Sequence, residues 1–166
     1  MTSAMPKIGL PASSLDEGRR AETISQLNAG LANMLDLTLC AKQAHWNIRG
    51  PNFQGLHELF DVIAAESRTW SDSLAERLVT LGGTAHGTSQ DIISGSKIGN
   101  FPTDEHRWMN LCREMHSRML KCAEQLRNFA NELDDELITQ DLVIEIVRGL
   151  EMRSWMVAAH LDQQQS

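Results

Sequence analysis

The sequence predicts an all-α fold, a four-helix bundle with a long crossover that carries a short extra helix between the second and third helices. Proline occurs only four times in 166 residues, and the glycine-rich breaks lie near Gly50, Gly82 and Gly95, so long helices fit between them. Apolar residues recur there at alternating steps of three and four, and no segment shows the alternation of a strand. The length suits one domain with one core.

The first two helices are expected between Ser14 and Leu81. A capping box of Ser14 and Glu17 would start the first helix, which we expect to end near Asn47. Its apolar face consists of Ile24, Leu27, Leu31, Met34, Thr38, Ala41 and His45. The second helix is expected from about Phe53 to Leu81. Its apolar stripe consists of Leu56, Phe60, Ile63, Trp70, Leu74, Leu78 and Leu81.

The crossover should contain loop and one short helix near Ser89. After the last proline, Thr103 with Asp104 and Glu105 favours the start of a third long helix, since such residues suit a helix N-terminus. We expect that helix to end in the acidic stretch after Asn131. Its inner face would consist of Trp108, Leu111, Met115, Cys122, Leu126 and Phe129.

The fourth long helix is expected from about Ile138 to Leu161. Its predicted inner face consists of Leu142, Ile146, Leu150, Trp155 and Ala159. Four long helices with one crossover match the ferritin-like arrangement, among others. We therefore predict a ferritin-like four-helix bundle domain over residues 15–162, a flexible N-terminal tail at 1–14 and a short C-terminal tail at 163–166.

Composition and charge exclude several classes of protein. Hydrophobic residues make up 42% of the chain and charged residues 22%, and no apolar run reaches the roughly 18 residues of a membrane span. The formal net charge of −7 argues against extensive binding of nucleic acid or anionic lipid and favours cationic partners. The first 14 residues lack the apolar stretch of a signal peptide, which predicts a cytoplasmic protein.

Familiar catalytic and metal signatures are absent. The chain has no GxGxxG, GxxxxGK, HExxH or GxSxG motif, and its three widely spaced cysteines suit reduced core thiols better than disulfides or a CxxC metal site. Ferritin-like bundles usually build a di-iron site inside one chain from ExxH motifs. The residues three positions before the six histidines are Lys42, Gln54, Gly83, Thr103, Arg113 and Val157. None is acidic, which excludes an ordinary intrachain di-iron site.

A different set of candidate ligands remains. His57 and Asp61 lie four residues apart on the second helix, Asp72 and Glu76 lie four apart further along it, and His45 ends the first helix. From His57 to Asp72 is about 22 Å of helix rise, with a net rotation of only about 60°, so the two pairs share a side but not a metal. A second chain with this helix antiparallel would bring them together, which makes a two-fold dimer part of the site.

These ligand types suit iron(II), and manganese or zinc less selectively. Each residue also has an ordinary structural interpretation. A histidine at the end of an apolar face, such as His45, is more often a packing residue. Asp72 and Glu76 have Arg77 and Arg68 nearby, and such groups usually form a solvated charged face.

The run KQAHWNIRGPNFQGLHELFD, followed by AERLVTLGGTAHGTSQ, closely resembles the Dps family, the DNA-binding proteins from starved cells, or miniferritins. The resemblance extends more loosely from about Ser14 to Asp162. It implies a ferritin-like bundle that assembles as a hollow homododecamer and acts as a ferroxidase. It also implies that iron(II) is oxidised preferentially by hydrogen peroxide, that the ferric mineral is stored inside, and that DNA and the cell are protected from oxidative damage. The two-iron centres would lie between two-fold-related subunits.

The resemblance assigns metal ligation to five positions of this chain. They are His45, His57, Asp61, Asp72 and Glu76. Trp46 falls where the family has a tryptophan beside the centre, where it would take up oxidising equivalents; simple packing is the alternative. Peroxide is a two-electron oxidant, so two iron(II) ions per event would avoid releasing hydroxyl radical. The protein would contribute positioning and charge compensation.

The segment between Asn131 and Glu145 contains six acidic residues and no lysine or arginine. A charge run is usually solvated surface. In similar proteins this segment lines the three-fold channels through which iron enters, because acidic rings concentrate cations. The candidates for such a channel are Asp134, Asp135 and Asp141.

Binding to DNA distinguishes an iron-oxidising storage enzyme from a structural protein that compacts the nucleoid. The best-known family members use a lysine-rich N-terminal tail, whereas the first 20 residues here have only Lys7, Arg19 and Arg20 as basic groups. The C-terminal LDQQQS adds no positive charge. We therefore expect no stable DNA complex at physiological salt. A third alternative is a helical bundle whose site binds zinc without redox chemistry.

Overall fold

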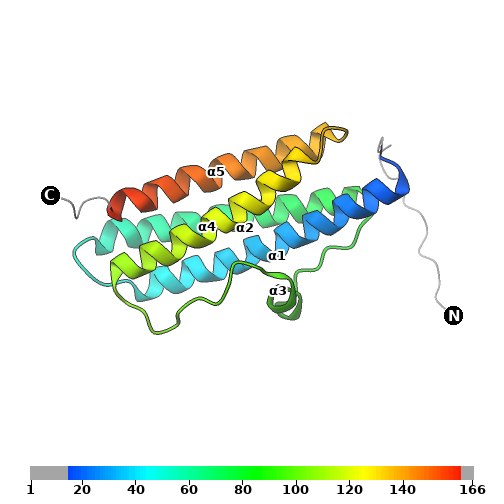
Figure 1. Cartoon of the computed structure of the whole chain (residues 1–166). Helices are drawn as coiled ribbons and strands as arrows, with labels where there is room; N and C mark the ends of the chain where they lie inside the picture. The colour runs from blue at the N-terminus through cyan, green and yellow to red at the C-terminus, as the bar shows by residue number, and fades with distance from the viewer. Residues whose placement is uncertain (1–14, 162–166) are drawn as a thin grey trace.

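The computed structural model describes residues 15–161, which are helical almost throughout (Figure 1). The helices are α1 (Glu17–Asn47), α2 (Phe53–Thr80), α3 (Ser89–Gly95), α4 (Trp108–Asn131) and α5 (Leu137–Leu161). The only β-type pairing within the described residues is an isolated bridge between Arg49 and Arg107. The predicted all-α fold, with a short helix near Ser89, is confirmed. The predicted tails at 1–14 and 163–166 lie outside the described residues.

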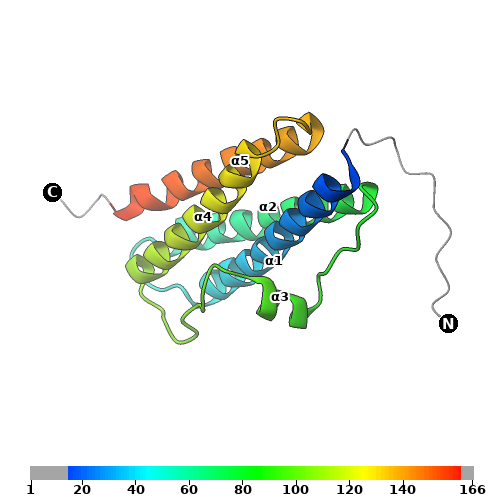
Figure 2. The same cartoon turned by 45° about the vertical axis from the view of Figure 1, so that its right-hand side comes forward.

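The four long helices form two antiparallel pairs, α1 with α2 and α4 with α5, which pack on each other. The segment after α2 runs back along the bundle, as Figures 1 and 2 show, so α4 starts at the same end as α2 and runs parallel to it. The short helix α3 lies outside the bundle against α1. One long crossover between the second and third long helices is the predicted topology.

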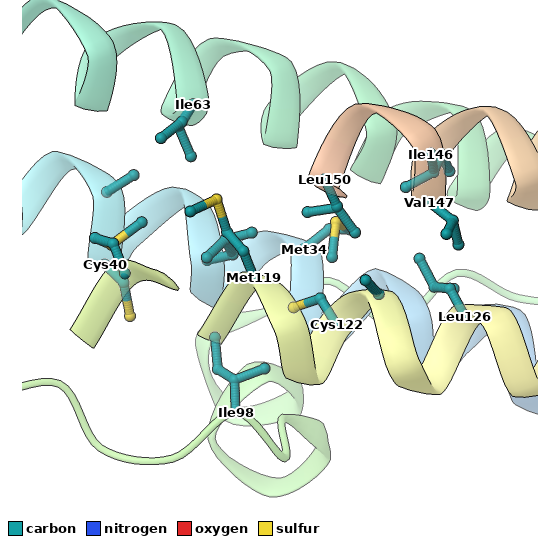
Figure 3. Packing of buried hydrophobic residues seen from close by; sticks show 14 of the residues in the cluster. Met34, Cys40, Ile63, Ile98, Met119, Cys122, Leu126, Ile146, Val147 and Leu150 are labelled. Carbon is teal, nitrogen blue, oxygen red and sulfur yellow. The ribbon is translucent and has the colours of Figure 1, made fainter. Parts of the chain in front are cut away.

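The core draws side chains from all four long helices and from the crossover. Figure 3 shows Met34 and Ile63 facing Met119 and Leu150, while Ile98 of the crossover enters from the side of α4. The three cysteines are all buried and free, as predicted: Cys40, Cys112 and Cys122. Burial raises the pKa of the Cys40 and Cys112 thiols to about 12, which makes them poor nucleophiles near neutral pH.

The helix α1 is capped differently from the prediction. Asp16 has extended backbone angles, and its side chain accepts a hydrogen bond from the backbone N–H of Arg19 at 2.9 Å. Glu17 is consequently the first helical residue and cannot be the third residue of a capping box. Ser14 lies outside the described residues, and the prediction that it caps this helix is wrong because Asp16 occupies that position.

The helix α4 begins later than predicted, at Trp108 rather than near Thr103. Two backbone hydrogen bonds explain the shift. The N–H of Arg49 donates to the carbonyl of His106 at 2.8 Å, and the N–H of Trp108 donates to the carbonyl of Arg49 at 3.3 Å. These bonds hold the preceding segment extended. Glu105 still acts at the helix start, since its Oε1 accepts from the two backbone N–H groups that follow it.

The inner face of α5 is also rotated from the predicted one. Trp155 is 68% exposed and Ala159 is exposed, whereas Ser154 and Val157 are buried. Trp155 is five residues after Leu150, so it points about 140° away from it, while a residue four positions on points only about 40° away. The prediction that Trp155 and Ala159 face the core is therefore wrong.

Candidate metal centre

His45 and His57 meet where the end of α1 faces the start of α2. Their rings are stacked, with centroids 3.7 Å apart and an interplanar angle of 22°. The Nδ1 of His45 lies 2.7 Å from the carbonyl oxygen of His57, and the Nδ1 of His57 lies 2.8 Å from that of His45. Since a carbonyl only accepts, each Nδ1 carries the proton. Both Nε2 lone pairs are thereby left for a metal ion, a common arrangement around ligating histidines.

Asp61 lies one helical turn after His57 and is more than half exposed. Its Oδ1 accepts a hydrogen bond from the Lys42 ammonium at 2.6 Å. That bond and the nearby charge of Lys42 lower the pKa of the Asp61 carboxyl. The structure therefore combines a carboxylate that stays ionised with two imidazoles at one end of the α1–α2 pair.

Asp72 and Glu76 are exposed on α2, well beyond this cluster. Within residues 15–161 neither carboxylate has a hydrogen bond or an ion pair to another side chain. Arg77 is directed elsewhere: its guanidinium donates to Thr139 Oγ1 and to Glu136 Oε1, each at 2.9 Å. Asp72 and Glu76 therefore do not pair with Arg77, and their exposure is also what the alternative of a solvated charged face predicts.

The five candidate ligands thus form two separate groups in one chain. His45, His57 and Asp61 are together, and Asp72 and Glu76 lie apart from them on the same helix. Among the described residues, no three histidine, cysteine, aspartate or glutamate side chains are close enough to hold a metal ion. One chain by itself therefore provides two separate groups of candidate ligands, neither of which forms a metal site among the described residues.

The surface around the histidines contains features that sequence reasoning missed. Lys42 lies 5.6 Å from the ring centroid of Trp46, which is 67% exposed, so one ammonium contacts both this ring and Asp61. Phe53 stacks on His57 with centroids 5.0 Å apart. Lys42 is three residues before His45 and Phe53 four before His57, so helical spacing could have identified both.

Comparisons with known proteins identify the family of this chain. The family model of the ferritin-like domain matches residues 24–166. A DNA protection during starvation protein, or Dps, from Agrobacterium fabrum is 33% identical over 151 residues, which cover 90% of this chain and 93% of that protein. The chain belongs to the Dps family.

Solved Dps structures have the same fold as this chain. The high-iron form of Dps from Microbacterium arborescens superimposes with a TM-score of 0.84 at 30% identity and covers 91% of this chain and 99% of that one. Dps from Mycobacterium smegmatis gives a TM-score of 0.88 at 28% identity, over 96% of this chain and 92% of that one. The Dps chain described here is therefore a ferritin-like four-helix bundle, as its sequence predicts.

The acidic segment of this Dps chain is held by two arginines. Arg19 of α1 forms an ion pair with Asp135 at 3.3 Å and donates to the carbonyl of Glu132. Arg77 forms an ion pair with Glu136, which is only 5% exposed. Of the three predicted channel residues, Asp135 is thus partly neutralised. Asp134 and Asp141 are exposed and have no ion pair with another described residue.

The longest helices of the bundle are not membrane spans. Between residues 15 and 161, no helix combines the length and the apolar character needed to cross a bilayer.

Proposed function

We propose that this Dps protein is a ferroxidase that oxidises iron(II), preferentially with hydrogen peroxide, and stores the ferric product in a hollow homo-oligomer. Membership of the family supports iron storage and DNA protection in general. One observation supports the specific reaction most strongly: the reciprocal Nδ1 hydrogen bonds of His45 and His57, which leave the two Nε2 lone pairs available near the ionised Asp61.

The centre would be completed by a second copy of the chain. In a two-fold pair with antiparallel α2 helices, the histidines and Asp61 of one chain would face Asp72 and Glu76 of the other. The exposed apolar residues beside these ligands support a protein surface that is covered in the assembly. They are Leu39, Trp46, Phe53 and Val62. Each two-fold contact would then hold two centres.

Iron(II) is the substrate of this reaction. Two iron(II) ions each lose one electron, peroxide accepts both electrons, and its O–O bond breaks to give two hydroxide ions. The carboxylates of Asp61, Asp72 and Glu76 would offset the positive charge of the paired ions, and the fixed imidazoles would set their position. Trp46 is proposed to take up oxidising equivalents beside the centre, because its ring is exposed next to His45.

We further propose a dodecamer with acidic channels. The unpaired Asp134 and Asp141 would attract iron(II) at a three-fold axis, with Asp135 contributing less because Arg19 pairs with it. The buried free cysteines suit a reducing compartment, which supports a cytoplasmic location.

Zinc is the main alternative to iron at this set of ligands, and manganese is another, since histidine and carboxylate serve all three metals. Anaerobic loading with iron(II), followed by titration with peroxide, distinguishes a ferroxidase from a redox-inactive metal site. We expect about one peroxide per two iron(II), rapid appearance of ferric absorbance and little hydroxyl radical, because two electrons are taken up together. A radical yield equal to that of free iron would contradict the proposal, and protein loaded first with zinc is the control.

DNA binding by a coating mechanism is the second candidate function, and one structural observation disfavours it. Arg19, one of only three basic residues among the first 20, is engaged by Asp135 and by the carbonyl of Glu132. Few cations are therefore left to displace counterions from phosphates. Protection of DNA would then come from the removal of iron and peroxide.

A further inference from the structure

The start of α4 lies beside the turn of residues 48–52 that joins α1 to α2 (Figure 1). Trp108, the first residue of α4, is partly buried and packs against the core. Its indole ring lies directly against Gly50, where an added methyl group would be only 2.5 Å from Trp108 Cδ1. The proposed ferroxidase reaction gives this ring no role, although it contacts the turn that leads to the candidate ligands.

The backbone of this turn has little freedom to move. Gly50 has a φ of 129°, a conformation that residues with a side chain rarely adopt. The neighbouring Arg49 forms backbone hydrogen bonds with His106 and Trp108. Since the indole ring is in contact with the Gly50 backbone itself, the turn cannot shift toward α4 without displacing the ring.

The turn is connected to the first candidate ligand of α2 by two contacts. The carbonyl of Gly50 accepts a hydrogen bond from the backbone N–H of Phe53, the first residue of α2, at 3.1 Å. The Phe53 ring in turn stacks on His57, with centroids 5.0 Å apart. Asn52 gives this helix no side-chain cap, so the start of α2 depends more heavily on the turn before it.

The segment before α4 also holds the end of α1. Nδ1 of His106 lies 3.2 Å from the carbonyl oxygen of Asn47, and the side-chain amide of Gln43 donates to the carbonyl of Thr103 at 3.0 Å. Asn47 and Gln43 are each two residues from His45. Because each candidate imidazole is hydrogen-bonded to the backbone of the other helix, the directions of both rings depend on the relative position of these two helix ends.

We propose that Trp108 is a positioning residue for the metal ligands. Its ring, packed against Gly50, fixes the turn between α1 and α2. The fixed turn then holds the imidazoles of His45 and His57 in the orientation that leaves both Nε2 lone pairs available. Trp108 acts through the turn and is not itself a ligand. This inference rests on the proposed function, because it assumes that the two histidines bind metal.

Zinc binding tests the inference without iron or peroxide. The metal-free assembled protein is titrated with zinc(II) in a calorimeter, and the heat that His57→Ala removes is assigned to this site. Trp108→Ala should weaken zinc binding there about 10-fold, as the loss of groups that orient ligating histidines commonly does. Trp108→Phe, which keeps an aromatic ring beside the turn, should restore most of the affinity. Unchanged zinc affinity in Trp108→Ala would overturn the proposal.

A control separates positioning from a general loss of stability. Trp108→Ala removes a large side chain and should destabilise the bundle. Leu126→Ala is the matched variant, because Leu126 is fully buried in the second half of α4, far from the turn. It should lower the free energy of unfolding but leave the zinc affinity unchanged. An equal loss of zinc affinity in both variants would show that any loosening of the bundle weakens the site, and would overturn the specific role of Trp108.

Gly50→Ala tests the contact from its other side. Its methyl group must displace either the turn or the indole ring, so zinc binding should again weaken. Because both changes act through one contact, the double variant Gly50→Ala with Trp108→Ala should lose less binding free energy than the sum of the two single losses. Losses that add fully would show that the two residues act independently, which contradicts the proposal.

Failure of this inference is distinguishable from failure of the ferroxidase proposal. Zinc binding that depends on His57 and Trp108, in a protein that does not oxidise iron(II) rapidly, would contradict the ferroxidase and support the positioning role. Rapid oxidation by the unaltered protein, together with normal zinc affinity in Trp108→Ala, would do the reverse. Zinc binding that His57→Ala leaves unchanged would overturn both, because the histidines would then not bind metal.

Discussion

Glu105 shows how a single side chain sets the start of an element. Its Oε1 accepts hydrogen bonds from the backbone N–H groups of His106 and Arg107, and its Oε2 accepts from the side chain of Asn110 at 2.6 Å. The Arg107 guanidinium also donates to it. The bonds to Arg107 and Asn110 hold the pKa of the Glu105 carboxyl well below its ordinary value. Glu105 therefore fixes the turn into α4.

We predict that Glu105→Gln weakens the start of α4 at neutral pH. A carboxyl whose folded pKa is depressed stabilises fully above its unfolded pKa and loses that effect as pH falls through the folded value. Protection of segment 106–111 from hydrogen exchange should therefore be lower in the variant at pH 7, and the difference should shrink below about pH 4. Glu124→Gln, on an exposed part of α4, is the control. A difference that grows with acidification would contradict this account.

The site shows which residue properties the sequence could predict. The grouping of the five candidate ligands follows from helical spacing, because His57 and Asp61 share one face of α2. The orientation of the two imidazole rings could not be predicted from spacing, because each ring is held by a carbonyl group twelve residues away in the chain. The partner of Arg77 was equally hidden: Glu136 lies 59 residues further on, directly before α5, and only the packing of α2 against α5 makes the contact.

At the scale of elements, α2 is fixed against α5 near the carboxylate pair. The Trp70 ring lies directly over Gly149, where a Cβ would overlap its atoms. Glu66 lies one turn before Trp70 on α2, and its carboxylate accepts a hydrogen bond from the guanidinium of Arg153 on α5 at 2.7 Å. Two contacts from one helix thus set the position of the segment that carries Asp72.

We predict that Gly149→Ala destabilises the fold by about 1–3 kcal/mol, as overpacking in a tight contact commonly does. It should also slow iron oxidation, because the shifted Trp70 lies two residues before Asp72. Chemical denaturation and the initial oxidation rate measure the two effects. Gly55→Ala is the matched control: nothing lies near its added methyl group, so stability should stay the same or rise by up to about 1 kcal/mol. Equal stability of both variants would contradict the packing argument.

Helix existence was easier to predict than helix boundaries or exact faces. Apolar periodicity located all four long helices, since burial of one stripe dominates their stability. The start of α4 was mispredicted because it depends on backbone hydrogen bonds with Arg49, which lies more than 50 residues earlier in the chain. Trp155 was assigned to the core on hydrophobicity alone, although it lies outside the face that Ser154 and Val157 define.

For the whole molecule, net charge decides which partners are accessible. A formal charge of −7 per chain would be multiplied in a dodecamer and would repel the DNA duplex over most of the surface. The unpaired carboxylates near Asp134 would attract iron(II) for the same reason. Twelve weakly basic tails would offset the repulsion only in part.

We therefore predict no stable complex with DNA at neutral pH and physiological salt. A gel-shift assay with plasmid at about 150 mM salt should leave the plasmid unretarded at micromolar dodecamer, because few phosphate-binding cations are available. The same assay at low salt is the control, since any weak electrostatic contact is strongest there. Retardation at the higher salt would favour the DNA-coating function instead.

The central claim is that each ferroxidase centre takes ligands from two chains, and mixed assemblies test it most directly. His57→Ala and Asp72→Ala should each leave the assembly intact but abolish rapid iron oxidation. When the two variants are unfolded together and reassembled in equal amounts, a two-fold contact should restore about a quarter of the centres, because half of the pairs are mixed and each mixed pair has one complete centre. Recovery of rapid, peroxide-dependent oxidation to about that level is the result we predict. Mixed assemblies that remain as inactive as each variant alone would contradict the shared centre and place the ligands of each site within one chain.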